Sequence, residues 1–292
     1  MRRGFTLFEM LIVVGLISIV AVLVIPTLTM VRERALSAQC KTNLHQLAVA
    51  CQGYAMREGY LPWGSISPQD HDRNYWRTDA YGLFLPRENP ALHGVQSWSE
   101  FSSFCWDFTR KAGETGWRSG EMFGGMSADS LFSCPKCDSQ SDNWDGNHIT
   151  GYNYNVCFLG YVENDACSRK YPTAWSAIKA PASVVVFGDG GYAGGPNKFM
   201  RAPMQESRKN SQYDTSSSSL RKAGTQAFRH GWGRWRHCNM AFLDGHVEEF
   251  RNPYKAGGSR GWVHEKSHTA FISSGNGIYG PRGFGIADDY TE

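Results

Sequence analysis

An uncharged apolar run near the amino terminus is the strongest constraint on how this chain can fold. Residues 10–31 contain no Asp, Glu, Lys or Arg, and Leu, Ile and Val predominate. As a helix this run would rise about 33 Å, which matches the roughly 30 Å hydrocarbon core of a bilayer. It is longer than the apolar region of a secretory signal, about 7 to 15 residues. We therefore predict a membrane-spanning helix at the start of the chain.

Four residues in or next to this run need an explanation beyond a plain anchor. Glu9 stands at its edge, where a carboxylate costs about 2 to 3 kcal/mol unless something pairs with it. Residues 2–3 are both arginine and favour the cytoplasmic side, so the rest of the chain is expected on the opposite side of the membrane. Pro26 removes one helical hydrogen bond and predicts a kink or local melting of the helix.

Residues 4–9, Gly-Phe-Thr-Leu-Phe-Glu, resemble the processing motif of type IV prepilins and of type II secretion pseudopilins. In that family the prepilin peptidase cuts after the glycine and methylates the new amino terminus. The resemblance implies cleavage after Gly4, methylation of Phe5, and assembly roles for Glu9 and Pro26. It implies other pilin or pseudopilin subunits as partners, and an inner-membrane protein with its head on the extracytoplasmic side or in a surface or periplasmic filament.

Apolar residues continue at helical spacing beyond the membrane run. They step by three or four and form one helix face, which consists of Leu36, Cys40, Leu44, Leu47, Cys51 and Tyr54. Gly59 and Pro62 supply a stop. We predict one helix over 5–57, about 80 Å long, whose second half packs against the rest of the chain. The two cysteines on this face would lie about 16 Å apart, too far for a disulfide with each other, and are predicted to be buried as small apolar residues.

The predicted fold class is α+β and pilin-like, with a long amino-terminal transmembrane helix packed on a globular head that contains a small antiparallel sheet. Thirty-two glycines and 13% aromatic residues favour a turn-rich β head. The predicted divisions are a leader at 1–4, a transmembrane or filament-core helix at 5–31, an amphipathic second half at 32–58, and the head at 59–292. A head of this size favours a minor subunit.

Several elements of the head can be predicted from local pattern. We predict strands over 151–160 and 182–187, a helix over 98–111, and an exposed polar loop over 194–224. Residues 239–243 and 246–250 are predicted to form a hairpin, because the Asp244-Gly245 pair between them favours a type I′ turn.

The hairpin carries a second resemblance. Its residues are similar to a carboxy-terminal signature of prepilin-like proteins, in which a histidine is followed nine residues later by an Asp-Gly pair. The spacing here differs, and either His230 or His237 could correspond. His237, Asp244 and His246, with Asp189 as a fourth ligand, suit zinc or a similar structural metal ion. The alternative is that Asp244 makes the turn while the histidines form local hydrogen bonds.

Four of the eight cysteines lie in the head near a Cys-Pro-Lys-Cys sequence. Cys134 and Cys137 have the spacing of a metal knuckle, but Cys157 and Cys167 are too far apart along the chain for a ribbon-type zinc site. An extracytoplasmic location favours disulfides among these four over a zinc site or free thiols. The connectivity does not follow from the spacing.

The remaining composition narrows the function. A formal charge of +3 without a basic run argues against nucleic acid as a partner. No nucleophile elbow, phosphate loop or His-Glu-x-x-His motif is present, so we expect no enzyme and no required cofactor. We predict a structural pilin or pseudopilin subunit. The alternative is a tethered module that binds a glycan, secreted cargo or another surface ligand, and a tethered hydrolase is a weaker alternative.

Overall fold

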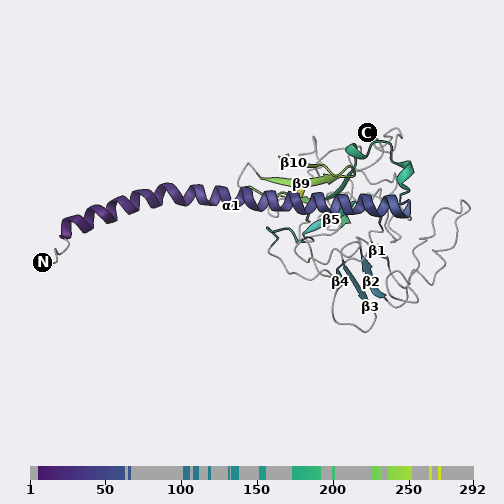
Figure 1. The fold of residues 1–292 in the computed structure, drawn as a ribbon, viewed down its shortest axis with the longest axis horizontal. Helices are drawn as coiled ribbons and strands as arrows, with labels where there is room; N and C mark the ends of the chain where they lie inside the picture. Colours follow the sequence, from purple (N-terminus) through teal and green to yellow (C-terminus); the bar gives the residue numbers. More distant parts are fainter. Residues whose placement is uncertain are drawn as a thin grey trace, which may run out of the picture.

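The structure of the 292-residue chain is a computed structural model. It describes residues 6–62, 65–66, 101–105, 108–111, 118–119, 131, 133–137, 151–155, 173–191, 199–200, 225–231, 236–251, 263–264 and 269–270. The fold is α+β and pilin-like, as predicted, with one long helix that projects far beyond a head rich in β-structure (Figure 1).

The first element, α1, is a continuous helix of 52 residues over Leu7–Glu58, which confirms the predicted helix. It ends at Gly59, where a φ of 84° lies in the left-handed region that glycine adopts without strain. Pro26 lies inside the helix and does not melt it, because a proline removes only one of many backbone hydrogen bonds. The amino-terminal half of α1 curves gently away from the head (Figure 1).

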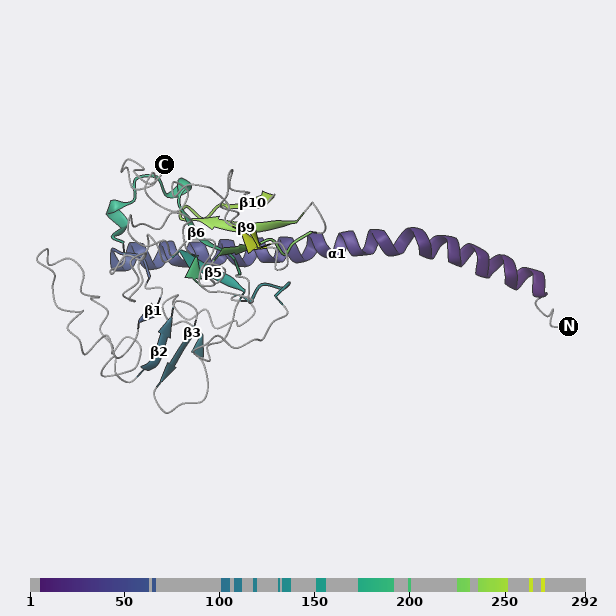
Figure 2. The same cartoon turned by 180° about the vertical axis from the view of Figure 1, so that it is seen from behind.

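The second half of α1 packs on the head, also as predicted. Its buried face contains the apolar stripe together with two polar residues, and consists of Ser37, Cys40, Asn43, Leu44, Leu47, Ala48, Cys51, Tyr54 and Ala55. This face contacts three strands of the main sheet, β6 (Val185–Gly191), β9 (His237–Phe242) and β10 (Val247–Arg251) (Figure 2). The prediction that Cys40 and Cys51 are buried is confirmed, since both have 0% exposure.

The main sheet has eight strands among the described residues, and β6 lies at its centre. Its order is β10 (Val247–Arg251), β9 (His237–Phe242), β6 (Val185–Gly191), β8 (Thr225–Ala227), β12 (Thr269–Ala270) and β11 (Val263–His264). A further strand, β5 (Tyr152–Asn155), pairs antiparallel with β6 and parallel with β7 (Phe199–Met200). The core lies between α1 and this sheet, where the rings of Tyr152, Tyr154 and Phe187 are fully buried.

The strand predicted over 182–187 begins and ends later than expected. Residues Pro181–Ser183 form a short 3-10 turn, which suits a proline at the first helical position, and β6 follows from Val185 to Gly191. The glycines at its end were expected to leave the sheet. They stay in it because they pair with neighbouring strands, Gly188 with β9 and the last two glycines with β8. A side chain at Gly188 would also clash with the sulfur of Met240.

Two other predicted segments are only partly described. The strand predicted over 151–160 is present as β5, while residues 156–160 lie outside the described residues. The exposed loop predicted over 194–224 contains β7, in which Met200 is fully buried. That part of the prediction is wrong, because pairing with β5 draws this segment into the sheet. The remainder of 194–224 lies outside the described residues.

The predicted hairpin is present as β9 and β10, with a different turn. The Gly245 N–H donates to the Phe242 carbonyl at 2.9 Å, so Leu243 and Asp244 are the central residues of the turn. Gly245 follows them with a φ of 93°, in the left-handed region. This is the arrangement of a three-residue hairpin loop, in which a left-handed residue follows the turn. The Leu243 N–H also donates to the Val184 carbonyl at 2.9 Å, which ties the turn to the start of β6.

The helix predicted over 98–111 is wrong. Residues Phe101–Cys105 form β2 and Phe108–Lys111 form β3, and these pair antiparallel within a second sheet. Its order is β1 (Ser65–Ile66), β2, β3 and β4 (Arg118–Ser119). The phenylalanines imitate helical spacing, but aromatic, Thr and Cys residues favour strands, and pairing supplies the ladder of hydrogen bonds.

Candidate functional site

The apolar half of α1 is one of two features with functional potential. Its most apolar 18-residue window has a mean hydropathy of 2.9, and 0% of it is buried against the head. By length and composition, α1 is the only helix among the described residues that could cross a membrane. An uncovered surface of this size on a long helix requires another apolar environment, which is lipid or further helices of the same kind.

A capping box starts this helix and involves the glutamate of the processing motif. Glu9 Oε2 accepts hydrogen bonds from the Thr6 N–H and from Thr6 Oγ1, each at 2.8 Å, and the Glu9 N–H donates to Thr6 Oγ1 at 3.3 Å. The Thr-x-x-Glu pattern predicts this box, and our sequence reasoning missed it. Among the described residues only Oε2 accepts hydrogen bonds, so in this part of the chain Oε1 is open to a further donor. Gly4 and Phe5 lie outside the described residues.

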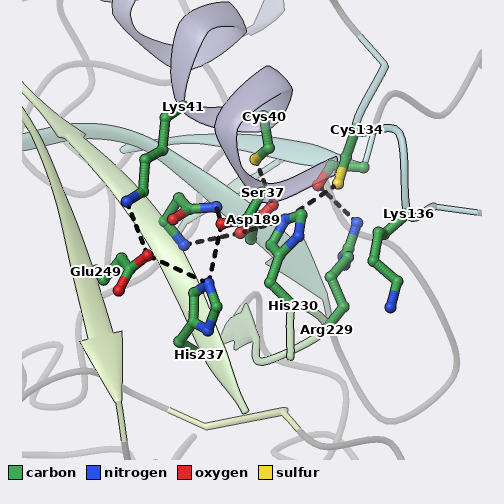
Figure 3. Close-up of polar contacts among 12 residues, drawn as sticks. Ser37, Cys40, Lys41, Cys134, Lys136, Asp189, Arg229, His230, His237 and Glu249 are labelled. Atoms are coloured by element: carbon green, nitrogen blue, oxygen red, sulfur yellow. Dashed lines mark hydrogen bonds and ion pairs between the residues drawn. The ribbon is translucent and has the colours of Figure 1, made fainter. Parts of the chain in front are cut away.

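The second feature is a buried polar cluster between α1 and the sheet. It contains Cys40 from α1, Cys134 from the segment 133–137, Asp189 from β6, and His230 from the segment between β8 and β9. All four residues are buried, and their side chains point toward one another from these four parts of the chain (Figure 3). Their potential ligand atoms all lie within 4.8 Å of one another.

The contacts inside the cluster converge on Asp189 and on one nitrogen of His230. Cys40 Sγ lies 3.3 Å from Asp189 Oδ1, and His230 Nε2 lies 3.3 Å from Asp189 Oδ2. The same Nε2 lies 3.7 Å from Cys134 Sγ. The Asn239 N–H donates to Asp189 Oδ2 at 2.8 Å and fixes the carboxylate against β9.

A guanidinium group lies next to the cluster. Arg229 Nη1 donates to the Gly151 carbonyl at 3.0 Å, and Nη2 donates to the Gly190 carbonyl. Gly190 follows Asp189 on β6, and Gly151 precedes β5, the strand in which Tyr152 pairs with Asp189. The guanidinium is therefore held beside the carboxylate and the Cys134 thiol. Its positive charge therefore influences the ionisation of both groups.

The ionisation of the cluster departs from that of exposed groups. Burial by itself would raise the pKa of Asp189, but the charges and hydrogen bonds of His230, together with the charge of Arg229, lower it. Burial would lower the pKa of His230, but Asp189 and Cys134 raise it to about 9. The pKa of Cys134, which burial would raise, is lowered to about 6, chiefly by hydrogen bonds with Cys40 and His230.

The cluster does not have the geometry of a Cys-His-Asp catalytic triad. In such a triad the nucleophile and the carboxylate contact opposite nitrogens of the imidazole. Here Cys134 and Asp189 both face Nε2, whereas the Nδ1 of His230 is buried without a partner among the described residues. The imidazole therefore cannot pass a proton between the two groups in the manner of a triad.

A half-buried ionic group connects α1 to β10 beside the cluster (Figure 3). Lys41 Nζ lies 2.7 Å from Glu249 Oε1, and Arg251 Nη2 lies 3.1 Å from the other oxygen. His237 Nε2 lies 3.5 Å from Glu249 Oε1 and 2.9 Å from Ser37 Oγ. Burial would raise the pKa of Glu249, but Lys41, Arg251 and His237 lower it to about 2.

Glu249 should therefore stabilise the fold at neutral pH and lose this effect in acid. Because its folded-state pKa lies below the ordinary value of 4.5, the contribution is complete above about pH 4.5 and is lost as the pH falls towards 2. We expect Glu249→Gln to lower the unfolding midpoint at pH 7, and the difference from the wild type to shrink between pH 5 and about 3. Thermal unfolding followed by circular dichroism measures this.

Glu248→Gln is the matched control, because Glu248 is the neighbouring carboxylate on β10 and is 56% exposed. Its effect should be small at every pH. Equal pH dependence of the two differences would show that the pairing of Glu249 with Lys41 does not contribute to stability.

The structure separates the four residues predicted to share a metal. Asp189 belongs to the buried cluster, while His237 contacts Ser37 and Glu249 at its edge. Asp244 lies in the hairpin turn, about five residues along β9 from the contact of Asp189 with this strand, which corresponds to about 16 Å. It accepts a hydrogen bond from the His246 N–H at 3.1 Å and contacts His246 Nδ1 at 2.5 Å. Asp244 and His246 thus follow the alternative given in the sequence analysis, in which Asp244 makes the turn and the histidine forms local hydrogen bonds.

The predicted disulfides find no support among the described cysteines. The side chains of five cysteines are described, and no disulfide joins any of these to another: Cys40, Cys51, Cys134, Cys137 and Cys238. Cys157 and Cys167 lie outside the described residues. The sequence signals that could have indicated the cluster were the Arg-His pair at 229–230 and the acidic residue at the end of a strongly apolar strand. Cys40 gave no such signal, since it fits an apolar stripe.

Comparison with known families agrees with the amino-terminal resemblance. Residues 1–25 match the family model for the prokaryotic N-terminal methylation motif, and residues 29–104 match a family described as a protein of unknown function, DUF1559. The searches of curated proteins and of solved structures found no match. The chain thus carries a prepilin-type amino terminus on a pilin-like fold, and this motif is the one that prepilin peptidase processes.

Proposed function

We propose that this prepilin-like chain is a structural subunit of a filament, either a type IV pilus or the pseudopilus of a type II secretion-like system, in the rank of a minor subunit. The observation that carries the proposal is the apolar half of α1, which no described part of the head covers. A cleaved and methylated chain would hold this half first in the inner membrane, with the head on the extracytoplasmic side, and then among the same helices of other subunits.

The glutamate at the start of the helix fits the same proposal. The capping box leaves Glu9 Oε1 open, so the carboxylate can meet the amino terminus of a neighbouring subunit in the filament core. A buried carboxylate without a partner would cost roughly several kcal/mol. The pairing would therefore fix how far neighbouring subunits are displaced along the filament axis. In a simple membrane tether the charge would have only its capping role, for which a neutral glutamine would also serve.

The test separates the charge of Glu9 from its capping role. Glu9→Gln keeps an oxygen for the capping box but removes the charge, whereas Thr6→Ala removes the cap and keeps the charge. In the native envelope, we expect both variants to be cleaved after Gly4. We expect the wild type and Thr6→Ala to appear in sheared filaments, and Glu9→Gln to remain in the membrane fraction.

Three results would contradict the proposal. If the wild-type chain retains Met1, or begins after residue 30, the prepilin route is wrong. If Glu9→Gln enters filaments as well as the wild type does, the charge has no assembly role. A wild-type chain that is processed but never found in filaments would indicate the tethered module. The full chain in detergent, offered polysaccharides, would then distinguish binding from turnover.

A further inference from the structure

We propose that Cys40, Cys134, Asp189 and His230 form a structural zinc site that fastens α1 to the head. The four residues supply two sulfurs, one oxygen and one nitrogen, all of which are ordinary zinc ligands. The site differs from the set expected from the sequence, of which it retains only Asp189. It is also independent of filament assembly, since it lies in the half of α1 that packs on the sheet.

Several distances between the ligand atoms are close to those of a tetrahedral site, and all of these atoms lie within 4.8 Å of one another. With zinc bonds of about 2.3 Å to sulfur and about 2.1 Å to nitrogen and oxygen, ligand atoms lie roughly 3.4 to 3.8 Å apart. Cys134 Sγ and His230 Nε2 are 3.7 Å apart, and Asp189 Oδ2 and His230 Nε2 are 3.3 Å apart. Cys40 Sγ and Asp189 Oδ1 are 3.3 Å apart. Small side-chain movements would place all four atoms around one ion.

The unusual contacts of His230 also point to an ion. A neutral imidazole can donate only one proton from Nε2, yet this nitrogen faces both a carboxylate and a thiol. If the lone pair of Nε2 bound a metal ion, the carboxylate and the thiolate could bind the same ion. This would explain why the three groups converge. Among the described residues the polar contacts of this ring are made by Nε2, the nitrogen that would bind the ion.

The charges around the site balance when zinc is present. Two thiolates and one carboxylate on Zn²⁺ leave one negative charge, and the guanidinium of Arg229 supplies one positive charge beside it. This balance matters because an uncompensated charge in a buried site is strongly unfavourable. Four protein ligands and complete burial leave no position for a substrate, so the site is structural.

The ligands come from segments far apart in the chain, and this defines the role of the ion. Cys40 belongs to the helix that leaves the head towards the membrane, while the other three ligands belong to the head. Zinc would therefore hold the head in a fixed position on α1. Because the site is assembled only in the folded chain, the binding free energy would add to the stability of the fold.

The experiment uses the full chain in detergent, purified without reductant and without added metal. We expect about one zinc per chain by elemental analysis, and a lower unfolding temperature after chelation that added Zn²⁺ restores. Replacement by Co²⁺ should give intense sulfur-to-cobalt charge-transfer bands. Loss of a residue that hydrogen-bonds to a zinc ligand lowers metal affinity roughly 10- to 100-fold. Cys40→Ser and Cys134→Ser remove ligands themselves and should each lower the affinity further.

Two serine variants are matched controls that leave metal binding unchanged. Cys51 is buried on the same helix but outside the cluster, so Cys51→Ser tests the effect of a buried hydroxyl alone. Cys137→Ser tests whether the ion is instead bound by the Cys-x-x-Cys pair of Cys134 and Cys137. If Cys137→Ser abolishes the cobalt bands while Cys40→Ser retains them, the ion lies elsewhere and the proposal is wrong.

Measurements on the wild type decide the question even if a ligand variant does not fold. Absence of bound zinc, together with no rise in unfolding temperature when Zn²⁺ is added to reduced protein, would overturn the proposal. A disulfide between Cys40 and Cys134, found by mass spectrometry of peptides from the native envelope, would overturn it as well. Stoichiometric Co²⁺ with charge-transfer bands in the wild type would support it.

Discussion

Gly4→Val is expected to leave the whole chain uncleaved, with its leader attached and no methyl group on Phe5. The peptidase of the prepilin family cuts after a glycine. A branched side chain at this position would clash with an enzyme subsite that accommodates a residue without a side chain. The uncleaved chain would keep residues 2–3, both arginine, next to the apolar helix. Their charges are strongly unfavourable in a filament core, so assembly should be lost together with processing.

Intact mass and amino-terminal sequencing of the membrane-bound protein measure this effect. Gly53→Val is the matched control, because Gly53 is exposed on α1 and a Cβ there would meet nothing within 4 Å. We expect the control chain to begin at methylated Phe5 and the Gly4→Val chain to begin in the leader. The head should fold in both, since α1 begins only at Leu7. Recovery of methylated Phe5 from the Gly4→Val chain would refute the assigned cleavage site.

The sequence was most informative where structure depends on neighbours along the chain. The helix from Leu7 to Glu58 follows from a periodic apolar pattern, and the hairpin of β9 and β10 follows from two apolar runs around an Asp-Gly pair. The turn itself was misplaced by one residue, because Leu243 donates to the Val184 carbonyl of a neighbouring segment. Such a contact is not encoded in the turn residues.

The predictions failed where pairing between distant segments decides the conformation. Phe101, Phe104 and Phe108 have helical spacing, yet this stretch forms β2 and β3 because both strands also pair with others in a sheet. Gly188 resembled the end of a strand, although its missing side chain is what lets Met240 pack across β6. Local propensity is only a weak guide when a sheet supplies hydrogen bonds.

The buried cluster could not be predicted as a set. Cys40 and Asp189 are separated by 149 residues in the sequence, and Cys134 and His230 by 96. Each residue has an ordinary local interpretation: Cys40 fits an apolar helix face, and Cys134 belongs to a Cys-x-x-Cys pair. Only the packing of α1 across β6 and β9 brings them together.

Asp189→Asn is expected to lower the free energy of unfolding of the head by about 3 to 5 kcal/mol, even with metal chelated. Removing one member of a fully buried ionic group leaves the others without compensation. Here His230 and Arg229 would lose the carboxylate that balances their charges, although both remain held by the fold. Denaturant unfolding followed by the aromatic circular dichroism of the head measures the change.

Asp244→Asn provides the comparison, because Asp244 is an exposed carboxylate in the hairpin turn and its amide replacement can still accept the His246 N–H. Its effect should stay below about 1 kcal/mol. Arg229→Met separates charge from shape: combined with Asp189→Asn, it removes both opposite charges, so the double variant should lose less than the sum of the two single changes. A coupling of about 1 kcal/mol or more is expected for groups in contact. Additive effects would mean that the guanidinium serves only the carbonyls of Gly151 and Gly190, and that the charge of Asp189 is compensated by His230 alone.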